Sequence, residues 1–89
     1  IGGVDDVVIS LSPELRNAAM SVATSLRNTG KSVDLVLEDK RLKWAFKHAE
    51  RSGAQRLVMV MPDEWREGKV KIKDLESGEE VEVSVDLLE

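Results

Sequence analysis

A row of cations at helical spacing is the part of this sequence best suited to chemistry. Lys40, Lys43, Lys47 and Arg51 follow one another at steps of three, four and four residues. On a helix these steps place four positive charges along one side. The apolar residues between them fall on the other side: Leu42, Ala45, Phe46 and Ala49. Such a stripe is typical of a surface that binds a polyanion such as a nucleic-acid backbone, and a solvated helix face explains it equally well.

A tryptophan beside this stripe and a second row of lysines are two further features that could bind an anion or a nucleotide. Trp44 projects from the basic side, where its indole can stack on a nucleotide base, dock a protein partner or fold over a neighbouring loop. Lys69, Lys71 and Lys73 alternate along one expected strand and therefore share a face. This second basic row indicates anion binding and gives no information on sequence specificity.

The charges are divided unevenly along the chain, whose net charge is −4. Residues 40–73 hold ten cations and four acids, a net of +6. Residues 1–39 carry −3 and residues 74–89 carry −7. A basic centre between acidic ends can bind a polyanion locally, while the acidic parts limit non-specific adhesion.

The residue types needed for catalysis or metal binding are scarce. The single histidine, His48, has no evident partner, and we expect a structural or solvated role for it. Cysteine is absent, which removes disulfides and thiolate metal sites and suits an intracellular protein. No metal-ligand spacing is present in the sequence. We therefore expect no catalytic residue, metal or cofactor in this chain, and an independent small enzyme is a poor hypothesis.

Hydrophobic periodicity predicts strands that alternate with helices. The expected strands cover residues 7–11, 32–37, 56–61, 69–75 and 80–85. Expected helices begin at caps Ser12 and Asp39 and end near Gly30 and Gly53, and shorter ones cover 62–66 and begin at Asp86. This order predicts an α/β fold with parallel pairing, the apolar third strand at the centre and the last two strands as a half-exposed hairpin.

Length and hydropathy predict one domain covering residues 1–89. A chain of 89 residues buries roughly 60–65% of its unfolded surface, enough for one core. The apolar runs are too short to span a membrane, and no signal peptide is visible. The chain begins with Ile1 and not Met, so we expect a domain that comes from a longer protein.

Several motifs occur in an order that resembles a known family. Leu-Arg-Asn-Thr-Gly at 26–30 precedes a strand, and Leu42-Lys43, Phe46-Lys47, Ala49 and Gly53-Ala54 follow. Glu64, Gly68 and the run Val70-Lys71-Ile72-Lys73-Asp74-Leu75 complete the pattern. Together they resemble the C-terminal anticodon-binding domain of class IIa aminoacyl-tRNA synthetases, most closely that of histidyl-tRNA synthetase. The resemblance covers residues 6–88, and the letters LVLEDK and LKWAFK resemble plant-organellar or cyanobacterial members.

The resemblance implies a fold and a function. The family fold is a three-layer α/β/α sandwich with about three helices. Its mixed five-stranded sheet has the order 2-1-3-4-5, with strand 4 antiparallel. The implied partners are a tRNA anticodon stem-loop, that of tRNA-His, and the catalytic domain of a homodimeric parent ligase. That parent would use ATP, Mg²⁺ and histidine, in a bacterial cytoplasm or in a chloroplast or mitochondrion.

The resemblance also implies which residues contact RNA. Family members read anticodon bases from the start of the second helix, the turn after the third strand, and the fourth strand. These places correspond here to Asp39, Arg41 and Lys47, then Glu64, then Lys73. Lys43 of the basic stripe joins this RNA-binding set, and Trp44 is a candidate for stacking or docking.

Three positions qualify these site assignments. Met61 stands where the family usually has glycine, and Trp44 stands where it often has a polar residue. Glu64 has a purely structural alternative, in which it caps or braces the turn at Pro62. The alternative function is a protein-interaction or dimerisation domain that does not read tRNA, in which Trp44 docks a partner and the lysines form a solvated face.

Overall fold

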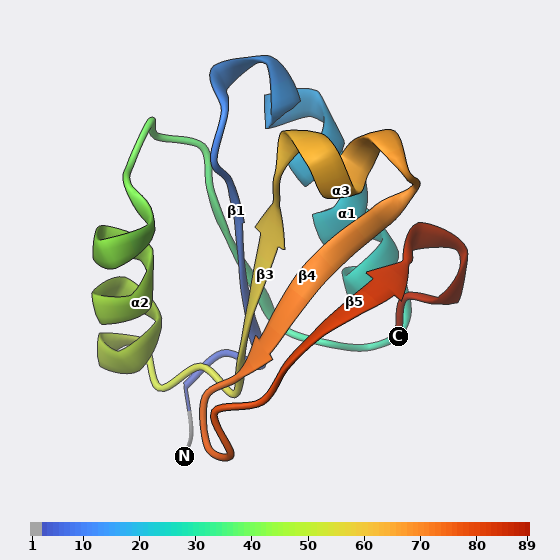
Figure 1. Ribbon diagram of the computed structural model, residues 1–89. Helices are drawn as coiled ribbons and strands as arrows, with labels where there is room; N and C mark the ends of the chain where they lie inside the picture. The colour runs from blue at the N-terminus through green and yellow to red at the C-terminus, as the bar shows by residue number, and fades with distance from the viewer. Residues whose placement is uncertain (1–2) are drawn as a thin grey trace.

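The chain forms a mixed five-stranded sheet with a helix on each face (Figure 1). The computed structural model describes residues 3–89. The strands are β1 (Asp6–Ser10), β2 (Val33–Val36), β3 (Arg56–Val60), β4 (Lys69–Asp74) and β5 (Glu80–Ser84). The helices are α1 (Arg16–Asn28), α2 (Leu42–Arg51) and α3 (Pro62–Arg66), with 3-10 turns at Pro13–Leu15 and Val85–Leu87.

The strand order is β2-β1-β3-β4-β5, as the resemblance implied. Strand β1 pairs in parallel with both β2 and β3, whereas β4 runs antiparallel to β3 and to β5. Every residue of β1 is buried, and so are four of the five residues of β3. Strands that are apolar on both faces belong at the centre of a sheet covered on both sides, which confirms the central place predicted for β3.

Alternation along the strands creates two cores, one on each face. Val8 of β1 and Val58 of β3 face α1, which buries Ala19, Val22, Ala23 and Leu26 against them. Val7 and Leu57 face α2, whose fully buried residues are only Ala45 and Ala49. The small alanines let α2 lie close to the sheet. Leu42, expected on this buried side, is 37% exposed because it occupies the first position of the helix, so that expectation was wrong.

The helix ends agree with the sequence, and of the two expected N-cap positions one agrees. Gly30 and Gly53 follow α1 and α2 with φ of 93° and 67°, backbone angles that glycine adopts without steric cost. Ser12 has extended cap geometry but makes no side-chain cap hydrogen bond. Asp39 does not cap α2, because the helix begins three residues later and Arg41 occupies the N-cap position. Ser12 therefore occupies the N-cap position predicted for it, whereas the prediction that Asp39 caps α2 was wrong.

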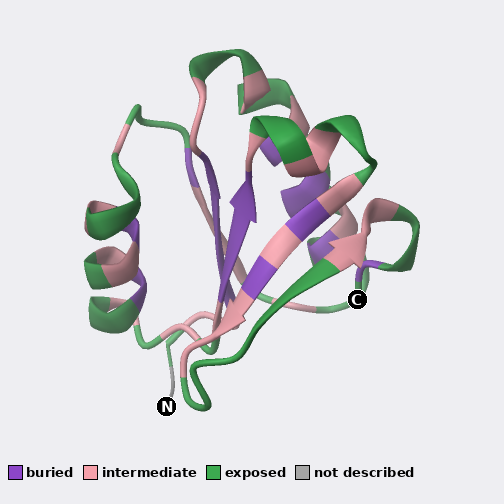
Figure 2. Ribbon diagram, in the orientation of Figure 1, coloured by how far each residue is buried: buried purple, intermediate pink, exposed green. Residues whose placement is uncertain are grey.

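Helix α2 covers only part of its face of the sheet. It lies over β1 and β3, while the hairpin of β4 and β5 extends beyond it (Figure 1). Most of β5 and the outward side of α2 are exposed, and β4 alternates between buried and half-buried residues (Figure 2). The half-exposed hairpin was predicted correctly, and it leaves an open strip of sheet beside the helix.

Candidate nucleic-acid interface

The exposed side of α2 carries the basic stripe. Lys43, Lys47 and Arg51 are exposed, opposite the two alanines buried on the sheet. Lys40 lies two residues before the helix and is half-buried. Three of the four predicted cations therefore share a solvated helical surface, and their summed positive charge attracts anions.

The second basic row, along β4, is largely paired with acids. Val70 and Ile72 face the α1 core, so Lys69, Lys71 and Lys73 lie on the α2 side. The Nζ of Lys69 lies 3.9 Å from Glu82 of β5 and 4.0 Å from Glu67, both through Oε1. The sequence suggested an open cationic row, but these cross-strand carboxylates reduce its net charge.

Glu64 belongs to the same network. Its Oε2 lies 3.7 Å from the Nζ of Lys71, which also lies 3.8 Å from Oε1 of Glu80. Met61, at the N-cap of α3, makes no side-chain cap hydrogen bond, and the ion pair of Glu64 with Lys71 braces α3 against β4. Its side chain is 17% exposed and is held toward the open strip of sheet. A carboxylate in this position can accept a hydrogen bond from a base amino group.

Lys73 bridges β4 and α2. Its ammonium lies 4.9 Å from the centroid of the Phe46 ring, which places Phe46 on the flank of α2 that faces β4. Within residues 3–89, no carboxylate lies within ion-pair distance of Lys73. Of the three lysines in the row, Lys73 is therefore the one whose charge remains available to a ligand.

The opposite flank of α2, facing β2, carries an aromatic stack. The rings of Trp44 and His48 are 4.7 Å apart between centroids and inclined by 9°. His48 Nε2 lies 2.7 Å from Oδ2 of Asp34 in β2, and the Nζ of Lys40 lies 5.1 Å from the Trp44 ring centroid. The expectation that His48 has no partner was wrong, because Asp34 lies 14 residues away in sequence and only the fold brings it near.

A hollow adjoins this stack, here called the Trp44 hollow. Its volume is about 410 Å³. It is lined by Asp39, Lys40, Arg41, Lys43, Trp44 and Lys47. Apart from Lys40, these are residues that the sequence assigned to RNA contact or stacking, and the fold brings them together. Glu64 and Lys73 are not among them, because they lie on the other flank of α2, beside β4.

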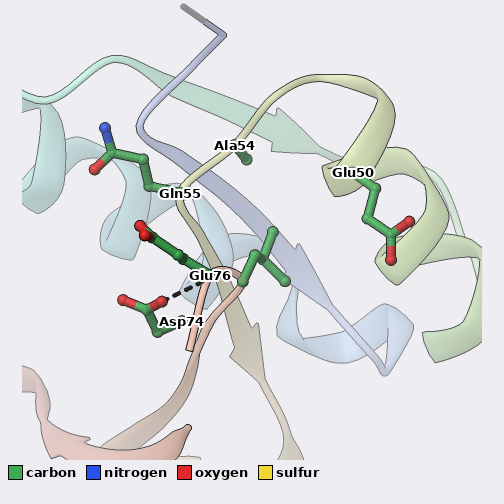
Figure 3. A pocket seen from close by; sticks show the side chains of 6 residues that line it. Glu50, Ala54, Gln55, Asp74 and Glu76 are labelled. Carbon is green, nitrogen blue, oxygen red and sulfur yellow. Dashed lines mark hydrogen bonds between the residues drawn. The ribbon is translucent and has the colours of Figure 1, made fainter. Parts of the chain in front are cut away.

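The other end of the sheet carries a different hollow with acidic walls (Figure 3). Glu50, Asp74 and Glu76 line it together with Gln55, Ala54 and Leu75. Hydrogen bonds from the backbone N–H of Ser77, and then from that of Glu76, lower the pKa of the Asp74 carboxyl and keep it charged. Three carboxylates repel a phosphate backbone, so this end of the molecule is unsuited to RNA.

Comparisons with known proteins agree with this geometry. A family model described as "Anticodon binding domain" matches residues 5–89. The chain belongs to the anticodon-binding domain family. A chloroplastic/mitochondrial histidine–tRNA ligase of Arabidopsis thaliana is 50% identical over 86 residues, which are 97% of this chain and 18% of that protein. The histidine–tRNA ligase of Bacillus subtilis is 31% identical over 84 residues, 94% of this chain and 20% of that protein.

A solved structure extends the comparison to the fold. Histidyl-tRNA synthetase from Nostoc sp. PCC 7120 superposes with a TM-score of 0.90 at 33% identity, covering 97% of this chain and 21% of that one. The chain thus spans about a fifth of the length of these relatives. The resemblance to the histidyl-tRNA synthetase domain, inferred from the motifs, is confirmed, and so is the sandwich fold.

Met61 departs from the usual family glycine without backbone strain. It precedes α3 with φ of −123° and ψ of 150°, extended values open to any residue. Its carbonyl accepts the N–H of Trp65 at 2.8 Å, and its half-buried side chain packs against the α2-side core. Met61 therefore places apolar volume beside Pro62.

Membrane-spanning and metal-binding features are absent from the part of the chain that the structure describes. No helix within residues 3–89 is long and apolar enough to cross a membrane. The same residues hold no group of three or more histidine or acidic side chains placed to bind a metal ion.

Proposed function

We propose that this domain recognises the anticodon loop of a tRNA, namely tRNA-His, as part of a histidine–tRNA ligase. The observation that carries the proposal is the 50% identity, over nearly the whole chain, to a protein with that name. The exposed cations of α2 support it, because a polyanion binds best where positive charge is exposed. The ligase, a homodimer, would supply the catalytic domain, ATP, Mg²⁺ and histidine, and would work in a chloroplast or mitochondrion, or in the cytoplasm if bacterial.

The proposed contacts divide by chemistry. Lys43 and Lys47, exposed on α2, bind phosphates. Glu64 and Lys73, beside the open strip of sheet, read the edges of unpaired bases as acceptor and donor. Asp39 and Arg41, in the loop before α2, supply a further acceptor and donor at the mouth of the Trp44 hollow.

Binding of a tRNA-His anticodon stem-loop at several salt concentrations tests this assignment. Lys47→Ala and Lys73→Ala are each expected to weaken binding. The slope of log K against log salt should fall by about 0.7 for each phosphate that a variant no longer neutralises. Arg16→Ala is the matched control, because Arg16 is an exposed cation at the start of α1, on the opposite face of the sheet.

Unchanged affinity and slope in both lysine variants would contradict the site assignment. Gel filtration with and without tRNA addresses the alternative function directly. Self-association of the domain without an RNA-dependent shift would support an interaction module instead.

A further inference from the structure

The indole of Trp44 is held in place before any ligand binds. One face stacks on His48, with 4.7 Å between centroids and 9° between planes. His48 is in turn anchored by its 2.7 Å contact to Asp34 of β2. Because Trp44 sits on α2 and Asp34 on the edge strand, the stack ties the helix to the sheet. A fixed aromatic ring loses little conformational entropy when a ligand stacks on it.

The ammonium of Lys40 also lies over the indole. The Nζ of Lys40 lies 5.1 Å from the ring centroid, at the end of a flexible four-carbon chain. This cation–π contact is weak at a solvated site. A ligand that carries both an aromatic ring and a negative charge could displace the Lys40 ammonium from the face of the indole. The displaced ammonium could then form an ion pair with the negative charge of the ligand.

The surroundings of the ring select an anionic ligand. Four of the six residues that line the Trp44 hollow are cations, and Asp39 is the one carboxylate. A flat aromatic floor with a cationic rim is the chemistry that binds an unpaired nucleotide, whose base stacks while its phosphate pairs. A protein partner would gain less binding free energy from this site, because charged groups surround the indole and would have to be desolvated.

We infer that the Trp44 hollow binds one unpaired nucleotide of the RNA, with its base on the indole and its phosphate beside Lys40 and Lys43. The inference rests on the proposed function and deepens it. The hollow lies on the β2 flank of α2, whereas Glu64 and Lys73 lie on the β4 flank. The stacked nucleotide is therefore a different one from the bases read beside β4, and the RNA crosses the outer side of the helix.

His48 and Asp34 act in this site as positioning residues. Neither lines the hollow, and their effect on a ligand passes through the orientation of the indole. Loss of the Asp34 carboxylate frees the imidazole, which then no longer fixes the plane of Trp44. Stacking affinity falls because the ring must be immobilised at the moment of binding.

An NMR titration of ¹⁵N-labelled domain with the anticodon stem-loop tests the inference. The indole N–H signal of Trp44 is expected to shift at saturation, while that of Trp65, half-buried in the α1-side core, stays in place as an internal control. Trp44→Ala should weaken binding about 10-fold, the usual loss for one base stack, and Trp44→Phe should weaken it less.

A thermodynamic cycle identifies the nucleotide. Stem-loops with an abasic site at each unpaired position in turn are bound to the natural domain and to Trp44→Ala. At one position the abasic site should lower the affinity of the natural domain about 10-fold and leave the affinity of Trp44→Ala almost unchanged. Asp34→Ala, which removes the partner of His48, should weaken binding of the intact loop but not of that abasic loop, a pattern that simple destabilisation of the fold would not produce.

The outcomes separate this inference from the function on which it rests. Absence of stem-loop binding by the natural domain would overturn the proposed function and the inference together. Normal binding with an unmoved Trp44 signal, and no loop position coupled to Trp44, would overturn the inference alone. Self-association that Trp44→Ala abolishes would place a protein partner in the hollow and would likewise overturn it.

Discussion

His48 Nε2 and Asp34 Oδ2 lie 2.7 Å apart and join helix α2 to edge strand β2. Only two alanines of α2 are fully buried, and the half-buried Trp44 and Phe46 complete its contact with the core on this face. The contact between His48 and Asp34 and the stacking of Trp44 on His48 also help to hold α2 on the sheet. The orientation of the basic stripe therefore depends on this pair.

Removal of this anchor should measurably destabilise the domain. Asp34→Ala is expected to lower the free energy of unfolding by about 1 kcal/mol, since the pair is partly solvated and its contribution is correspondingly modest. Urea denaturation followed by circular dichroism measures the change. Glu38→Ala, at an exposed acid in the following loop, is the control and should change stability little.

The contact between α2 and the sheet should tolerate no extra volume. Ala49→Leu is expected to cost about 1–3 kcal/mol, because Ala49 is fully buried and a larger side chain pushes the helix away. Leu42→Ala, at the exposed start of the same helix, should cost less than about 1 kcal/mol. Equal losses in the two variants, in the same urea assay, would contradict the packing described.

Helix α2 also illustrates which features could be predicted from the sequence and which could not. Periodicity correctly located the helix and its buried alanines, and the apolar run of β3 marked the centre of the sheet. Periodicity could not show that Leu42 lies at the helix start, beyond the edge of the core. Asp39 was wrongly expected to cap α2, because a sequence pattern does not fix the exact first residue of a helix and this helix begins at Leu42.

The site was harder to predict than the fold. The cations of α2 and Trp44 were visible from spacing alone. The pairing of Lys69 and Lys71 with Glu82 and Glu80 depends on the register of β4 against β5, which the hairpin turn sets. His48 lies four residues after Trp44, on the same side of the helix, and that spacing was the one available signal for the stack.

Base discrimination should depend on Glu64. Glu64→Gln is expected to reduce the preference for the matched anticodon by about 1–3 kcal/mol, because one hydrogen bond to a base is removed or altered. Stem-loop dissociation constants for the matched and altered anticodons provide the measurement. Glu67→Gln is the matched control, since Glu67 is exposed and its one ion-pair partner within residues 3–89 is Lys69. If Glu64→Gln showed the same ratio of affinities for the matched and altered anticodons as the natural domain, Glu64 would not contribute to base recognition.

Stability should depend on pH through Asp74. Backbone N–H groups of Ser77 and Glu76 lower the pKa of its carboxyl below the ordinary 3.8. A lowered pKa in the folded state means that the charged form stabilises the domain above pH 3.8, and that this contribution disappears as the pH falls through the folded pKa. Asp74→Asn should thus be less stable than the natural domain at pH 7.

The difference between the natural domain and Asp74→Asn is expected to shrink as the pH falls below 3.8. Urea midpoints of both proteins across this range provide the measurement. A difference that does not change with pH would show that the charge of Asp74 does not stabilise the hairpin turn.

The proposed function requires that this domain distinguish one anticodon from another. The most direct test is an NMR titration with the tRNA-His anticodon stem-loop and with a loop of altered anticodon. We expect tighter binding of the matched loop, with shifts concentrated at residues 39–47, Glu64 and Lys73. Equal affinity for both loops, with small shifts spread over all lysines, would contradict the claim and leave only electrostatic contact.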